Sequence, residues 1–114
     1  MDRPRALIMT SFKRGEVVLV DFGMAAKVRP AVVVSIPKAD SQRNMSVVVP
    51  LTTEIRGGQC EVAIPKPKWL MDVCVVNLMG IAGIDNARIR RVLGQFPPAQ
   101  PADIEDGLIR MLGL

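Results

Sequence analysis

The chain has 114 residues, of which 49% are hydrophobic and only 4% aromatic, a size and composition typical of one globular domain. It contains no histidine, and its two cysteines, Cys60 and Cys74, do not form a CxxC spacing. Histidine is the usual acid–base residue at neutral pH and the commonest zinc ligand, so we expect neither a zinc site nor a histidine-based ribonuclease. Fifteen Lys and Arg against eleven Asp and Glu give a net charge of +4, which suits a polyanionic partner without requiring one.

The sequence also predicts a cytoplasmic location. The first apolar cluster, at residues 6–9, is too short for the apolar region of a signal peptide. No stretch approaches the roughly 20 apolar residues that a membrane-spanning helix needs. We therefore expect a soluble protein in a reducing compartment, without a membrane partner.

Short runs rich in valine, isoleucine and leucine predict β-strands along most of the chain. They cover residues 16–22, 30–36, 45–53, 60–65, 73–78 and 87–93. Pro50, within the third run, predicts a bulge or an edge position because proline has no N–H for a β-ladder. Five to six short strands without intervening helices predict a small β-barrel rather than βαβ units.

A different pattern follows Pro97-Pro98, where residues 101–112 predict a C-terminal helix. Pro101 suits the first helical position, and acidic residues in the first half of the helix favour its dipole. Apolar residues repeat at helical spacing and form one face: Ile104, Leu108, Met111 and Leu112. Gly107 costs about 1 kcal/mol relative to alanine, so this helix needs to pack on the barrel or on a second subunit. We expect a homodimer that buries part of this face.

Three segments carry recognisable motifs: KRGEVVLVDFG, KVRPAVVVS, and VVVPLTT followed by a turn and EVAIP. Each motif is short, but their order and spacing together resemble the MazF/PemK/Kid family of toxins. The resemblance extends from about Lys13 to Leu112 and weakens after Pro65. It implies a single SH3-like barrel domain, with an arm at residues 1–11, the barrel at 12–96 and the helix at 101–112. It also implies a homodimer with a cognate antitoxin as partner.

The resemblance further implies an activity and its residues. Such proteins cut single-stranded RNA, such as mRNA, at short sequence motifs without metal or another cofactor. The Arg of the Arg-Pro pair and the first Thr of the Thr-Thr pair are active-site residues, which here are Arg29 and Thr52. Both residue types suit the chemistry, because attack by the ribose 2′-OH puts negative charge on phosphate oxygens that a guanidinium and a hydroxyl can bind. We predict further RNA contacts at Lys27, Thr53, Arg56, Asn77, Arg88 and Arg90.

The sequence departs from the family pattern at several positions, so the family motifs do not identify which residue acts as the general base. The loop at residues 23–28 is shorter than in many relatives and lacks the acidic or histidine residue often found there. Asn77 and Met79 occupy positions where the PemK/Kid branch carries the Arg and Asp of an Arg-x-Asp motif, so one carboxylate is missing. The carboxylates near the predicted site are Asp21, Glu54, Glu61 and Asp85. Glu54, directly after the Thr-Thr pair, is our candidate base among them, and a solvent-facing turn charge is the alternative interpretation.

Other interpretations stay open at the level of sequence. Trp69 is predicted as a core or dimer anchor, with stacking on a base as the alternative. A gyrase-poisoning toxin of the CcdB sort would share the barrel without needing Arg29 and Thr52. A non-catalytic nucleic-acid-binding barrel would explain the missing carboxylates. The leading hypothesis is a metal-independent endoribonuclease toxin.

Overall fold

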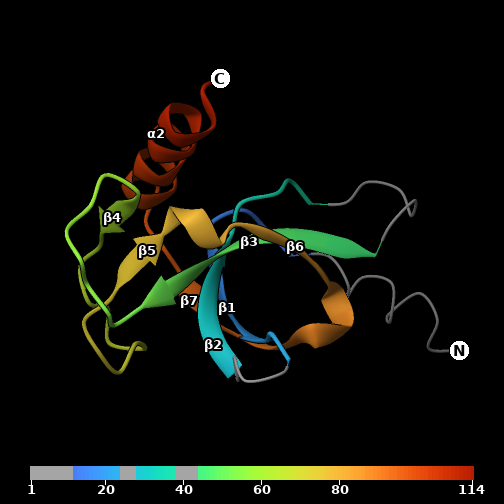
Figure 1. Cartoon of the computed structure of the whole chain (residues 1–114). Coiled ribbons are helices and arrows are strands. Elements are labelled where there is room, and N and C mark those ends of the chain that lie inside the picture. The colour runs from blue at the N-terminus through green and yellow to red at the C-terminus, as the bar shows by residue number, and fades with distance from the viewer. Residues whose placement is uncertain (1–11, 24–27, 38–43) are drawn as a thin grey trace, which may run out of the picture.

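The computed structural model describes residues 12–23, 28–37 and 44–114, so the predicted N-terminal arm and Lys27 lie outside the described residues. Within these ranges the chain forms one antiparallel sheet and a C-terminal helix at one end of it (Figure 1). The strands are β1 (Glu16–Asp21), β2 (Val28–Val33), β3 (Met45–Thr52), β4 (Glu61–Ala63), β5 (Val75–Asn77), β6 (Ala82–Asp85) and β7 (Ile89–Gln95). The helices are the short 3-10 turns η2 (Leu78–Gly80) and η3 (Asn86–Arg88) and the helix α2 (Ala99–Leu112).

The sheet is organised around β3. Its strands pair in the order β4-β5-β3-β2-β1-β7, and β6 pairs with β3 as well. On the side away from β2, β3 pairs first with β6 and then, at Leu51 and Thr52, with β5. A mainly β fold with a C-terminal helix is therefore confirmed. The described pairings leave β4 and β7 at the ends of an open path, so hydrogen bonds do not close the predicted barrel.

The predicted strands all appear, with bounds shifted by a few residues, and a further strand, β6, was not predicted. The β6 segment contains Gly83 and buries only Ile84, so it lacks the apolar run that marks the other strands. The bulge or edge position predicted at Pro50 is wrong, because β3 is a central strand and pairs in regular register with β2. Pro50 instead lies where the β6 and β5 ladders are interrupted, and Gly80 approaches its ring there.

The valine-rich strands bury both of their faces. Side chains alternate between the two faces of a strand, and here each face has its own apolar cluster. Val17 and Val49 lie in the cluster that Ile104 of α2 covers. Their neighbours Val18 and Val48 lie in a second cluster on the other face. Burial on both faces explains why these strands read as continuous apolar runs instead of alternating ones.

Helix α2 begins at Ala99, two residues before its predicted start. Pro101 is therefore the third helical residue and not the first, and its missing N–H is harmless because first-turn amides have no partner within a helix. The first turn holds no acidic residue, but Asp103 and Glu105 lie in the first half of the helix, as predicted, and Arg110 lies in its last turn. None of the described helices is long and apolar enough to cross a membrane.

The apolar face of α2 packs on the chain's own sheet. Ile104 is fully buried, and Leu108 and Met111 pack against the same cluster. A Cβ at Gly107 would lie 2.6 Å from Leu78, so this glycine allows the helix to approach η2 closely. Within the chain, Leu108 and Met111 are half-buried and Leu112 is exposed, so burial of part of this face in a homodimer stays a prediction.

Candidate active site

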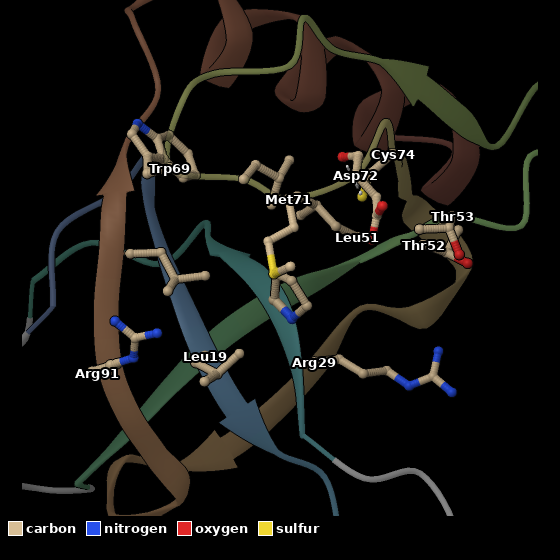
Figure 2. Close-up of a pocket in the computed structure, with 13 residues that line it drawn as sticks. Leu19, Arg29, Leu51, Thr52, Thr53, Trp69, Met71, Asp72, Cys74 and Arg91 are labelled. Carbon is tan, nitrogen blue, oxygen red and sulfur yellow. Dashed lines mark hydrogen bonds between the residues drawn. The ribbon is translucent and has the colours of Figure 1, made fainter.

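An open pocket of about 410 Å³ lies where β2, β1 and β7 run side by side. Leu19, two residues after Val17, faces the α2 side of the sheet, and it pairs with Pro30 on one side and Arg91 on the other. Residues 69–72 and Cys74, from the connection between β4 and β5, line the pocket from above, as Figure 2 shows. The full lining consists of Leu19, Arg29, Pro30, Leu51, Thr52, Thr53, Trp69, Leu70, Met71, Asp72, Cys74, Arg91 and Leu93.

The pocket brings together three predicted site residues, Arg29, Thr52 and Thr53. The β2–β3 ladder reaches as far as the pair Ala31–Pro50, and Arg29 and Thr52 each lie two residues beyond that pair. The Arg-Pro and Pro-x-Thr-Thr motifs therefore lie near one another, because the start of β2 and the end of β3 are adjacent in an antiparallel pair. In Figure 2 the guanidinium of Arg29 and both hydroxyls project on the same side of the pocket.

Thr52 is held by the turn that follows it. Its Oγ1 accepts a hydrogen bond from the backbone N–H of Glu54 at 3.0 Å. A hydroxyl that accepts in this way keeps its own hydrogen as a donor. The side chain of Thr52 can thus be fixed by the backbone and still donate to a bound phosphate.

Thr52 also lines a second pocket of about 320 Å³, together with Glu54, Arg56, Glu61 and Asn77. The polar groups here bind one another. Glu61 accepts from the backbone N–H of Arg56 at 3.0 Å and from that of Gly57 at 2.8 Å. Asn77 Oδ1 accepts from the N–H of Met79 at 3.2 Å and so caps η2.

Glu54 does not line the pocket of Arg29. Its side chain is 74% exposed and forms a 3.4 Å ion pair with Arg56, which is equally exposed. An ion pair in this setting contributes little to stability because water screens both charges. The structure therefore places Glu54 one residue beyond the pocket, turned toward the polar loop.

Arg88 and Arg90 lie outside both pockets and gather around Asp21. Arg90 Nη2 lies 3.1 Å from Asp21 Oδ2, and Arg88 Nη1 donates to the backbone carbonyl of Asp21 at 3.4 Å. Asp21 Oδ1 accepts the N–H of Gly23 at 2.8 Å. This backbone hydrogen bond lowers the pKa of Asp21 below its usual value, and the hydrogen bond from Arg90 has the next largest lowering effect.

Arg91, which was not among the predicted contacts, lines the pocket instead. Along β7, Ile89 pairs with Val20 and Arg91 pairs with Leu19, so the register skips Arg90. Such a bulge breaks the simple alternation of side chains and turns the following residue to a new face. Arg91 consequently shares the face of Leu19 (Figure 2).

The loop from Trp69 to Cys74 supplies the remaining lining residues, for which the sequence offers no regular pattern. Trp69 packs against Phe96 with ring centroids 5.7 Å apart, which confirms it as a core anchor, and it also faces the pocket. Burial, and then the nearby carboxylate of Asp72, raise the pKa of the Cys74 thiol. A thiol with a raised pKa stays protonated at neutral pH, so Cys74 is not suited to act as a nucleophile.

The chain is similar to known proteins in both sequence and fold. Residues 13–112 match the family described as PemK-like, MazF-like toxin of type II toxin-antitoxin system. Among solved structures, the chain is similar to an endoribonuclease from a mycobacterial species in complex with its cognate antitoxin, at 28% identity and a TM-score of 0.78, covering 90% of this chain and 96% of that one. An endoribonuclease from a mycobacterial species is similar at 27% identity and a TM-score of 0.75, covering 90% and 92%.

MazF from Deinococcus radiodurans shares the fold, at 24% identity and a TM-score of 0.75, covering 91% of this chain and 98% of that one. No curated protein sequence matches the chain. The family match spans nearly the whole chain and includes both motifs that form the pocket. The chain therefore belongs to the PemK-like, MazF-like family of toxins of type II toxin–antitoxin systems.

Proposed function

We propose that the chain is an endoribonuclease that cuts single-stranded RNA at the pocket of Arg29 and Thr52. The observation that carries this proposal is that Arg29 and Thr52, from the neighbouring strands β2 and β3, line one pocket that is large enough for a small ligand. Membership of the toxin family and the similarity to two endoribonucleases support it.

The reaction we propose is an internal transesterification. The ribose 2′-oxygen forms a bond to the adjacent phosphorus, and the bond from phosphorus to the 5′-oxygen of the next nucleotide breaks. The products carry a 2′,3′-cyclic phosphate and a 5′-hydroxyl. Because nucleophile and phosphate belong to one molecule, catalysis rests on positioning and on stabilising charge.

Arg29 and Thr52 divide that task. The guanidinium of Arg29 offers a fork of donors to the non-bridging phosphate oxygens, where negative charge grows in the transition state. The hydroxyl of Thr52, fixed through the N–H of Glu54, donates to the same phosphate. Glu54, one residue beyond the pocket, is our proposed acceptor for the 2′-OH proton, directly or through water, and water supplies the proton that the leaving 5′-oxygen takes up.

The other predicted contacts would bind RNA around this centre. Thr53 lines the same pocket, and Arg56 and Asn77 line the adjoining polar one. We propose that Arg88 and Arg90, with Lys27, bind phosphates farther along the strand. The sequence has no histidine, and the described residues contain no group of three carboxylate or cysteine side chains placed to hold a metal ion. We propose a reaction that needs neither a metal ion nor another cofactor.

We also propose the assembly that accompanies this activity. The chain would form one domain with an SH3-like barrel, act in the cytoplasm as a homodimer, and be held inactive by a cognate antitoxin. Exposed apolar residues near the end of the chain, Ile109, Leu112 and Leu114, are available for the dimer contact.

Incubation of the purified protein with single-stranded RNA in excess EDTA tests the activity. We expect cleavage of the single strand and resistance of the same sequence in a duplex. Loss of cleavage in EDTA, with recovery on adding a divalent ion, would contradict the metal-independent reaction. Binding of RNA without cleavage would favour the non-catalytic barrel, and inhibition of gyrase would favour the CcdB-like toxin.

A further inference from the structure

We infer that the pocket beside Arg29 holds one unpaired RNA base, stacked on Trp69, while Arg91 binds a neighbouring phosphate. This inference rests on the proposed ribonuclease function and adds a base-binding subsite to it. The subsite would make Trp69 a residue that selects and orients the substrate.

The indole ring of Trp69 is fixed in place before any ligand binds. A Cβ at Gly94 would lie 2.3 Å from Trp69 Cε2 and 2.5 Å from its Cδ2, so only a glycine at this point of β7 lets the ring lie on the strand. Phe96 supports the ring from the core, with the two ring planes at 41°. A ring held in this way loses little side-chain freedom when a base stacks on it.

Apolar side chains make up most of the rest of the pocket's lining. Leu19, Leu93 and Met71 line it along with Trp69. Met71 is 88% exposed, although methionine is apolar, and Figure 2 shows its side chain extending across the middle of the pocket. Methionine adapts its shape to a partner, so Met71 can cover a base whose other face rests against Trp69.

The charges around this apolar lining favour a nucleotide over an apolar side chain of a protein. Figure 2 shows Arg91 and Arg29 on opposite sides of the pocket, with Met71 and Leu19 between them. A nucleotide brings both a base for the apolar lining and an anionic phosphate for a guanidinium. The carboxylate of Asp72, on the same loop as Met71, can accept a hydrogen bond from an amino group of the base.

Fluorescence can test this directly, because Trp69 is the only tryptophan in the sequence. The protein is titrated with a short single-stranded oligoribonucleotide of mixed sequence, 2′-O-methylated so that it cannot be cut. We expect saturable quenching of the tryptophan emission, with the same Kd as fluorescence anisotropy of a labelled oligonucleotide. An abasic oligonucleotide of equal length carries phosphates without bases and should leave the emission unchanged.

Substitutions separate the base contact from the phosphate contact. Trp69→Leu should weaken binding about tenfold, the effect of losing one stacked base, and Trp69→Phe, which keeps a ring for packing and stacking, should lose less. Arg91→Gln should reduce the salt slope of binding by about 0.7, the value for one lost phosphate contact on a single strand. Arg110→Gln removes the same charge from α2, away from the pocket, and should leave the slope unchanged.

Saturated binding without a change in emission, or a folded Trp69→Leu variant with unchanged affinity, would overturn the inference and leave the pocket to an apolar side chain of a protein partner. Cleavage of unmodified RNA is measured in parallel. If the subsite is wrong but the proposed function is right, wild-type protein and Trp69→Leu will cut RNA equally well. If the wild-type protein neither binds nor cuts RNA, the function and the subsite both fail.

Discussion

The two pockets that meet at Thr52 differ in what their polar groups bind. In the polar pocket, Glu61 is engaged with the backbone of the following loop, and Glu54 is paired with Arg56. In the pocket of Arg29, most of the lining is apolar, with arginines at its sides. Polar groups that already hydrogen-bond to one another gain little binding energy from a ligand. An apolar pocket with a few charged groups gains more, because a ligand buries its apolar surface there. We therefore propose that the polar pocket fixes the loop after Thr52 and that the pocket of Arg29 receives the substrate.

Among the substitutions at the two pockets, Arg29→Ala should lower the cleavage rate most. Losing a guanidinium that meets charge only in the transition state should lower the single-turnover cleavage rate by about 10² or more, while RNA affinity falls little. Arg29→Lys keeps the charge and removes the fork of donors, so its rate should fall between those of Arg29→Ala and the wild type. A near-normal rate in Arg29→Ala would remove this residue from the site.

Thr52→Val tests the residue that the two pockets share. Valine keeps the shape and loses the hydroxyl, so the cleavage rate should fall about 30-fold, somewhat less than for a fully buried donor to a transition-state oxyanion. Thr52→Ser keeps the hydroxyl and should retain most of the rate. Equal rates in the valine variant and the wild type would show that the hydroxyl does not contact the phosphate.

Three residues of the Arg29 pocket, namely Arg29, Thr52 and Thr53, could be predicted from the sequence, because they lie in short motifs at the ends of strands with clear apolar runs. Arg91 could not, because the bulge at Arg90 changes which side chains face the pocket. Trp69 could be recognised as an anchor, but its approach to β7 depends on Gly94, which is 25 positions away in sequence and carries no local signal. The strand β6 also escaped prediction, because only one of its residues is buried.

Glu54→Gln measures how far the polar pocket takes part in the chemistry. As an exposed acceptor paired with Arg56, Glu54 should contribute less than a buried general base, so the rate at neutral pH should fall about tenfold. Glu54→Asp keeps a carboxylate and should recover part of this loss. An unchanged rate in the glutamine variant would show that solvent, and not Glu54, accepts the 2′-OH proton.

Glu61→Ala should have the smallest effect on cleavage, about threefold, because it acts only through the loop. Its carboxylate accepts from the backbone N–H groups of Arg56 and Gly57, and a charge-assisted hydrogen bond of this kind protects those amides. Hydrogen exchange at Arg56 and Gly57 should become about tenfold faster. Glu61→Gln keeps one acceptor oxygen and should show an intermediate rate, and unchanged exchange in the alanine variant would contradict a positioning role.

The chemical identity of the product ends tests the account most directly. RNA is incubated with the wild-type protein in excess EDTA, alongside the same RNA with a single 2′-deoxy substitution at the cleavage position. If Arg29 and Thr52 stabilise attack by the 2′-oxygen, the first RNA yields a 2′,3′-cyclic phosphate and a 5′-hydroxyl, and the second stays intact at that position. Cleavage of the 2′-deoxy RNA at the same rate, with a 5′-phosphate on the product, would contradict the account.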